Sequence, residues 1–317
     1  MIETIASAAF PVNEALRIKK NRFVPQGLDP RDIAGLKRVS IVTGIHGDEL
    51  EGQYVCYELA KFLNEHPEKL RGIVDIYPAM NPLGIDSIMR GIPGFDLDMN
   101  RVFPGANDGD MVEYIASSII KDLSGSDLVM DIHASNIFLT EVPQIRINRL
   151  HTETLVPLAK ACNVDFIWIH DNSTVLRSTL AYSLNSTGTP TLVVEMGVGM
   201  RLTPEYCFQL LDGIFNVMSV MGVLSGMERA VIDPVISDDP DDVVFMNSER
   251  AGIFIKEARH GMYLKKGALI GRVADPLTGT DLYTVTAPES GWLFTIREYP
   301  VVDKGSLIAR ILKNREG

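Results

Sequence analysis

The chain has 317 residues, of which 46% are hydrophobic, which is enough for one large domain or for a large and a small one. Its formal net charge of −11 at pH 7 repels phosphate backbones and anionic lipid, so we expect no nucleic-acid and no membrane-surface partner. No stretch reaches the roughly 18 apolar residues of a membrane span, and the first residues lack a basic start, so we expect a soluble, cytoplasmic protein.

Short β-branched runs alternate with longer segments of helical period over the first two thirds of the chain. The runs that we predict as buried strands are 39–43, 73–77, 128–132, 166–169 and 191–194. The segments that we predict as helices are about 49–65, 110–123, 152–162, 174–186 and 204–223. This alternation predicts an α/β domain with a mostly parallel mixed sheet flanked by helices.

The three cysteines, Cys56, Cys162 and Cys207, are odd in number, far apart and set in apolar, helix-like surroundings. Such a pattern argues against a disulfide framework and against a thiolate metal site. We therefore predict that they fill the core.

The composition and pattern of the sequence change after about Gly226. An acidic stretch at 237–242 precedes short strand-like segments that glycines and prolines separate. We predict an α/β domain at 1–226 and a small β-rich domain at 227–317 that resembles a biotinyl/lipoyl-like barrel. A carrier domain needs a modifiable lysine at a hairpin tip, and 273–291 contains none, so we expect this domain to form a wall of the site or the surface of a homo-oligomer.

Polar side chains follow several predicted strands directly. His46 and Glu49 are three residues apart and follow the strand at 39–43. His133 comes directly after the strand at 128–132, and Glu195 comes directly after the buried residues at 191–194. Ligand sites in open α/β sheets lie beyond the carboxyl ends of the strands. Two histidines and a carboxylate form a common ligand set for catalytic zinc. Each residue alone is more often structural, but together they predict a metal site.

The long loop at 79–109 adds a second polar group of residues. It contains five glycines and three prolines and is far longer than the connections usual in such a domain, as functional loops often are. It carries Arg90 and, eleven residues later, Arg101 beside Asn100. An Asn-Arg pair in a loop is by itself a common solvated surface contact.

Four motifs carry a resemblance, and they lie at 44–49, 96–103, 131–133 and 194–197. In order and spacing they resemble the succinylglutamate desuccinylase/aspartoacylase family, a branch of the zinc carboxypeptidase-like hydrolases. The resemblance spans about 39–200. The loop departs from the family's shorter Asp-Leu-Asn-Arg pattern, because Asp98 and Met99 precede the pair here.

The resemblance implies a catalytic site with one Zn²⁺ per chain. His46, Glu49 and His133 would hold the ion, and Glu195 would match the general base and acid.

The resemblance also implies residues that bind the substrate. Asn100 and Arg101 would grip a substrate carboxylate, and Arg90 would polarise the scissile carbonyl. The downstream arginines, which either line the pocket or lie on the surface, are Arg146, Arg149 and Arg177.

These residues lead to a functional hypothesis with two alternatives. The leading hypothesis is a zinc-dependent deacylase that cleaves the amide bond of a small carboxylate-bearing substrate such as an N-acyl amino acid. The first alternative is a metallocarboxypeptidase that acts on short peptides. The second is a binding module that kept the fold and lost the chemistry.

Overall fold

The computed structural model describes residues 1–95, 97–170 and 177–313. In chain order its helices and strands are β1 (Ile2–Ala9), β2 (Ala15–Phe23), α1 (Pro30–Ile33), β3 (Arg38–Thr43), α2 (Glu51–Glu65), η1 (Pro67–Lys69), β4 (Ile73–Tyr77), α3 (Pro82–Ser87), η2 (Met99–Arg101), α4 (Met111–Leu123), β5 (Leu128–Ala134), β6 (Leu139–Asn148), η3 (Arg149–His151), α5 (Thr152–Lys160), β7 (Phe166–His170), α6 (Leu180–Ser186), β8 (Thr191–Gly197), α7 (Pro204–Val220), β9 (Val235–Ser237), η5 (Pro240–Asp242), β10 (Val243–Asn247), β11 (Gly252–Lys256), β12 (Tyr263–Leu264), β13 (Leu269–Asp275), β14 (Thr280–Thr286), β15 (Gly291–Arg297), β16 (Val301–Val302) and β17 (Leu307–Lys313).

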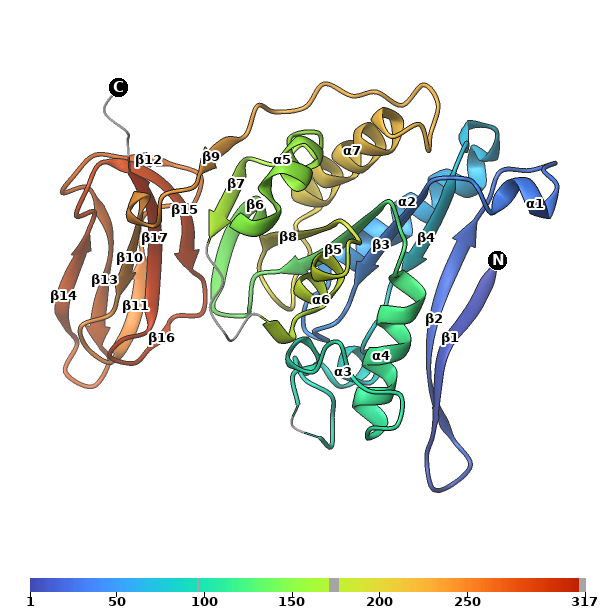
Figure 1. Cartoon of the computed structure of the whole chain (residues 1–317). Coiled ribbons are helices and arrows are strands. Elements are labelled where there is room, and N and C mark those ends of the chain that lie inside the picture. Colours follow the sequence, from blue (N-terminus) through green and yellow to red (C-terminus); the bar gives the residue numbers. More distant parts are fainter. Residues whose placement is uncertain (96, 171–176, 314–317) are drawn as a thin grey trace.

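A large mixed sheet forms the centre of the molecule (Figure 1). In the described part of the chain it has 13 strands, and its main path runs β1-β2-β4-β3-β5-β8-β6-β15-β17-β10. The strands β4, β3, β5 and β8 are parallel to one another, whereas β6 runs antiparallel to β8. Helices cover this sheet, so the structure confirms the predicted α/β fold class.

Helices pack on both faces of the parallel strands. Hydrophobic side chains of α2, α5 and α7 pack against one face. Those of α4 and α6 pack against the other face together with the N-terminal hairpin β1–β2. Burial on both faces explains why β3, β4 and β5 are nearly continuous apolar runs, as is typical of parallel strands.

The predicted strands correspond to β3, β4, β5, β7 and β8, and two of them extend at least two residues further than expected. β5 continues through His133 to Ala134, and β8 continues through Glu195 to Gly197. His133 and Glu195 therefore lie in the strands themselves, near their carboxyl ends, and not in the loops that follow. Of the predicted helix at 174–186, α6 covers Leu180–Ser186, residues 177–179 precede it, and residues 174–176 lie outside the described residues.

The sequence reasoning missed the hairpin β1–β2 and the strand β6. β6 contains Pro143 and the polar residues Gln144 and Arg146, a composition that resembles a loop more than a buried strand. The three cysteines are free and buried in the core, as predicted.

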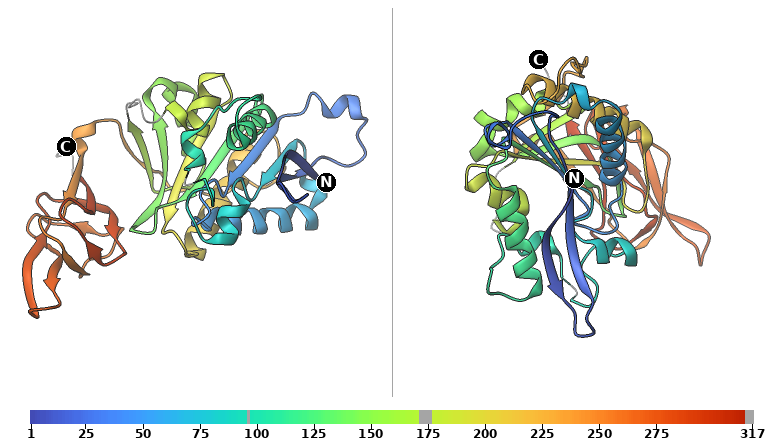
Figure 2. Two further views of the ribbon diagram at one scale, coloured as in Figure 1. Left: turned by 90° about the horizontal axis from the view of Figure 1, so that it is seen from below. Right: turned by 90° about the vertical axis from the view of Figure 1, so that its right-hand side faces the viewer.

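The C-terminal strands lie at one end of the molecule and the N-terminal hairpin lies at the other (Figures 1 and 2). The C-terminal strands have their own hydrophobic core and a second sheet in the order β14-β13-β11-β16. They also join the large sheet, because β15 pairs with β6 and β9 pairs with β7. The domain limits of 1–226 and 227–317 and the likeness to a biotinyl/lipoyl-like barrel stay predictions.

In the described ranges, every helix is too short or too polar to cross a lipid bilayer. The cytoplasmic location and the homo-oligomer stay predictions.

Gly213 gives a direct test of the helix packing. It lies inside α7, and a Cβ atom there would lie 1.8 Å from the backbone oxygen of Cys162. Although alanine favours a helix over glycine by about 1 kcal/mol, we expect Gly213→Ala to lower the free energy of unfolding by about 3 kcal/mol through overpacking. Urea denaturation measures this. As a control in the same helix, the exposed Val220→Ala should change it by less than about 0.5 kcal/mol.

Candidate metal centre

The turn between β3 and α2 brings His46 and Glu49 to the carboxyl edge of the sheet. Gly47 lies between them, and a Cβ atom at this position would lie 2.0 Å from the backbone carbon of Gly84. Glycine thus lets the turn pack directly on the backbone of α3. This close approach also joins the turn to the long loop, since the Gly47 amide donates to the Arg90 carbonyl at 3.2 Å.

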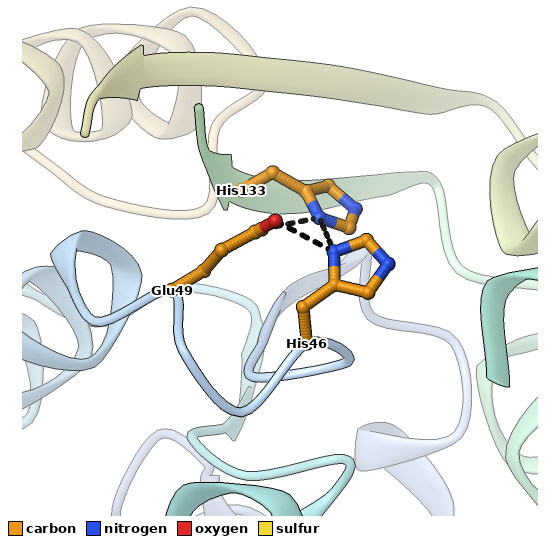
Figure 3. Close-up of side chains that lie close together, drawn as sticks. All are labelled: His46, Glu49 and His133. Atoms are coloured by element: carbon orange, nitrogen blue, oxygen red, sulfur yellow. Dashed lines mark hydrogen bonds and ion pairs between the residues drawn. The ribbon is translucent and has the colours of Figure 1, made fainter. Parts of the chain in front are cut away.

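His46, Glu49 and His133 form one buried cluster (Figure 3). The Nδ1 atom of His46 lies 2.8 Å from Glu49 Oε1, and the Nδ1 atom of His133 lies 2.9 Å from Glu49 Oε2. The two Nδ1 atoms are 3.2 Å apart. Three potential ligand atoms thus face a single point, and each residue is at most 4% exposed.

The spacing of these atoms fits a tetrahedral metal ion. Zinc bonds to nitrogen and oxygen of about 2.0–2.2 Å at tetrahedral angles place neighbouring ligand atoms about 3.3–3.5 Å apart. The two Nδ1 atoms, 3.2 Å apart, nearly have this separation, and each lies 2.8 or 2.9 Å from one of the two Glu49 oxygens. The cluster is therefore nearly arranged for an ion.

The far nitrogen of each imidazole lies beside a carboxylate. His46 Nε2 is 3.1 Å from Asp98 Oδ1, and His133 Nε2 is 3.2 Å from Asp131 Oδ2. The hydrogen bond to Asp98 favours the proton on Nε2 of His46 and leaves its Nδ1 lone pair for a metal. The charge of Asp131 favours the same tautomer of His133, whose Nε2 is buried and has no hydrogen-bond partner in the described part of the chain. Neither aspartate was among the predicted site residues.

The charges of the cluster also favour a cation. Burial opposes a positive charge on either ring. Glu49 and Asp98 outweigh it at His46, and Asp131 and Glu49 outweigh it at His133, so the pKa of both imidazoles is raised. If both imidazoles are neutral, Glu49, Asp98 and Asp131 carry three negative charges against the two positive charges of Arg90 and Arg101. The cluster therefore keeps an excess of negative charge, which favours a bound cation.

Arg90 reaches the cluster from the long loop. Its guanidinium donates to Glu49 Oε1 at 2.9 Å, and its Nη2 lies 2.9 Å from His46 Nε2. His46 Nε2 cannot donate to Asp98 and accept from Arg90 at the same time. If a metal were bound at Nδ1, Nε2 would carry the proton, and this nitrogen could not accept from Arg90.

Glu195 lies next to His133 in the sheet, because the two residues are paired in the register of β5 and β8. Its side chain is 16% exposed and forms an ion pair with Arg146 at 3.1 Å. Burial raises the pKa of the Glu195 carboxyl above its ordinary value, and Arg146 only partly offsets this. A carboxyl with a raised pKa is suited to take up a proton and to return it.

Asn100 and Arg101 lie in η2 and both reach the cavity. Asn100 Oδ1 accepts the backbone N–H of Leu180 at 2.9 Å, so the donor end of the amide is left for a ligand. Arg101 donates to the Asn100 carbonyl at 2.7 Å, and 44% of its side chain is exposed.

One cavity of about 680 Å³ contains the predicted site residues His46, Glu49, Arg90, Asn100, Arg101, His133 and Glu195. Arg177 is exposed and lies outside the lining of this cavity, as does Arg149, whereas Arg146 lies in it. The cavity is also lined by residues that sequence reasoning missed, which include His151, Trp168, His170, Tyr182 and Arg310. Period-two alternation in β6 and β7 was the signal for the residues at 146, 148, 168 and 170, which share one face.

Comparison with known proteins identifies related sequences. A family model described as the succinylglutamate desuccinylase/aspartoacylase catalytic domain matches residues 35–221. The N-alpha-acetyl-L-2,4-diaminobutyric acid deacetylase of Halomonas elongata is 27% identical over 277 residues, which cover 84% of this chain and 80% of the relative.

Solved structures with the same fold include the following two. The product-bound ectoine utilization protein EutE of Ruegeria pomeroyi has a TM-score of 0.78 at 24% identity, and the match covers 95% of this chain and 90% of that one. A succinylglutamate desuccinylase of Silicibacter sp. has a TM-score of 0.80 at 23% identity, with 94% and 90% covered.

The cluster predicts metal binding by the purified protein. We expect about one zinc ion per chain, and His46→Ala or His133→Ala should lose most of it because each leaves two of three ligands. Elemental analysis measures the metal. The half-exposed His66, which lies 3.7 Å from Glu68, provides the control, and His66→Ala should keep its zinc. Equal metal in all four proteins would rule out this ligand set.

Proposed function

Because the chain belongs to the succinylglutamate desuccinylase/aspartoacylase family, we propose that it is a zinc-dependent deacylase that cleaves the amide bond of an N-acyl amino acid. The observation that carries this proposal is the buried cluster of His46, Glu49 and His133 beside Glu195 in one cavity. The name of the relative from Halomonas elongata, a deacetylase of an N-acetylated amino acid, supports the substrate class.

His46, Glu49 and His133 would hold the zinc ion through two Nδ1 atoms and a carboxylate oxygen. When bound, zinc supplies Lewis-acid chemistry, which polarises a carbonyl oxygen and makes water nucleophilic near neutral pH. Asp98, through a hydrogen bond, and Asp131, through its nearby charge, favour the tautomer of the two imidazoles with the proton on Nε2.

Glu195 serves as the general base and acid. Its carboxylate accepts the proton of the attacking water and then passes this proton to the nitrogen of the leaving amine. The ion pair with Arg146 holds the carboxylate in place on the cavity side of β8. The raised pKa of Glu195 brings the protonated form within reach during turnover.

Arg90, Asn100 and Arg101 bind and orient the substrate. Arg90 donates hydrogen bonds to the carbonyl oxygen as negative charge develops on it. Arg101 pairs with the substrate carboxylate, and the Asn100 amide donates to the same group. Asn100 is fixed for this role by its bond from Leu180.

A screen of zinc-loaded protein against N-acyl amino acids and matched short peptides tests the proposal. We expect release of amino acid from the N-acyl compounds, and faster cleavage of the peptides would favour the carboxypeptidase alternative. Glu195→Gln should keep its zinc but turn over at least about a hundredfold more slowly, because it lacks the proton acceptor. An active, zinc-replete Glu195→Gln protein would contradict the role of Glu195.

Arg101 tests whether the substrate carries a carboxylate. Arg101→Ala should weaken transition-state binding by about 2–4 kcal/mol, measured as a fall in kcat/KM, because a desolvated anion loses its partner. The kcat/KM of Arg101→Lys should lie between those of the wild type and Arg101→Ala, because lysine keeps the charge but lacks the planar fork.

The control for Arg101 is a substrate whose carboxylate is amidated. The wild-type protein should cleave it poorly, and Arg101→Ala should lose little more. Equal cleavage of the amidated and free-acid compounds by the wild-type protein would exclude the carboxylate anchor.

A further inference from the structure

We propose that Arg310, on the C-terminal strand β17, is a positioning residue for the reaction and acts through Glu141 and Arg146 on Glu195. The inference rests on the proposed function, since it assigns a role in the same site. It makes the C-terminal strands part of the catalytic unit.

A chain of alternating charges connects β17 to the cavity. Glu141 is 1% exposed, and its Oε1 accepts from Arg310 Nη1 and, at 3.0 Å, from Thr295 Oγ1. Its Oε2 accepts from Arg146 Nη2 at 3.0 Å. The other terminal nitrogen of Arg146 forms the ion pair with Glu195 Oε1 at 3.1 Å. One guanidinium thus holds two carboxylates, and Glu141 is held by both arginines.

The sheet fixes this chain in space. In the strand register Glu141 of β6 lies opposite Thr295 of β15, and Thr295 lies opposite Arg310 of β17. The three residues form one row across three neighbouring strands. Rigid strands place side chains more accurately than loops do. Loss of the Arg310 side chain therefore removes a hydrogen-bond partner from Glu141.

Trp168 of β7 confines both guanidinium groups. The guanidinium carbons of Arg146 and Arg310 each lie 5.8 Å from the centre of its ring. The Nε atoms of both arginines are buried, and in the described part of the chain they have no hydrogen-bond partner. Buried ion pairs with such unmet donors are poor stabilisers of a fold. This favours a role in positioning over a role in holding the strands together.

The charge balance explains how Arg310 acts at a distance. Arg146 and Arg310 carry two positive charges against the two negative charges of Glu141 and Glu195. If Arg310 loses its charge, the buried Glu141 has Arg146 as its remaining cation and draws this guanidinium away from Glu195. Removing the charge of Glu141 as well leaves Arg146 to pair with Glu195 alone.

The test compares Arg310→Met with the double variant Glu141→Gln/Arg310→Met. Methionine keeps much of the packing against Trp168 and removes the charge. We expect Arg310→Met to lower kcat at least about tenfold with KM changed less than about twofold, and the double variant to regain most of kcat. A purely structural link predicts the opposite order, because the double variant has lost both sides of the link. The matched control is Arg272 of β13, which forms an exposed ion pair with Glu257. Arg272→Met should leave kcat unchanged.

Crystal structures of the same zinc-loaded proteins give a readout that does not need activity. The nitrogen of Arg146 should stay about 3 Å from Glu195 in the wild type and the double variant and move away in Arg310→Met. If the wild type deacylates nothing, the proposed function has failed and this distance alone decides the inference. If Arg310→Met does not fold, Arg310→Lys replaces it and should show an intermediate kcat. Unchanged kcat in Arg310→Met, a double variant slower than the single one, or an unmoved Arg146 would overturn the inference.

Discussion

The candidate site depends on the parallel register of β3, β5 and β8. Thr43 pairs with Ile132, and His133 pairs with Glu195, so the three strands end at the same edge of the sheet. Residues opposite each other in paired strands point to the same face, and a slip of one residue would turn His133 or Glu195 to the other face. The apolar residues between them, which are buried on both faces, hold the register. The core therefore sets the distance between the metal ligands and the proposed base.

Two buried groups of charges lie side by side at this edge, and they differ in balance. The group around His46 and His133 has an excess of carboxylates, so it attracts a cation. The group around Glu141 and Arg146 is neutral when all four members are charged. Isolated buried charges are costly, so the first group favours a bound cation, whereas the second pairs its charges among its own members. Glu195 lies between the two groups, where burial raises its pKa while Arg146 keeps the carboxylate in place.

Sequence reasoning predicted the residues whose position follows from local pattern. His46, Glu49, His133 and Glu195 each come directly after or at the end of an apolar run, and their spacing carried the family resemblance, which the family model confirms. The aspartates beside the histidines were missed for different reasons: Asp131 lies inside a run that looked like core, and Asp98 lies in a loop. Arg310 and Glu141 are 169 positions apart, and their contact requires the pairing of β6 with β15 and β17, which no local pattern contains.

The same pairing explains why residues beyond 226 also line the cavity, although the composition of the sequence changes there. β6 changes partners along its length, from β15 at 139–141 to β7 at 144–148, and Pro143 lies between the two stretches, where no N–H is needed for a ladder. Opposite β8, three steps of β6 from Glu141 to Gln144 match two steps from Gly197 to Glu195, so β6 has one extra residue there. Without this bulge, Glu141 and Arg146 would point to opposite faces. The bulge turns Glu141 to the cavity face, where it meets Arg146 from its own strand and Arg310 from β17.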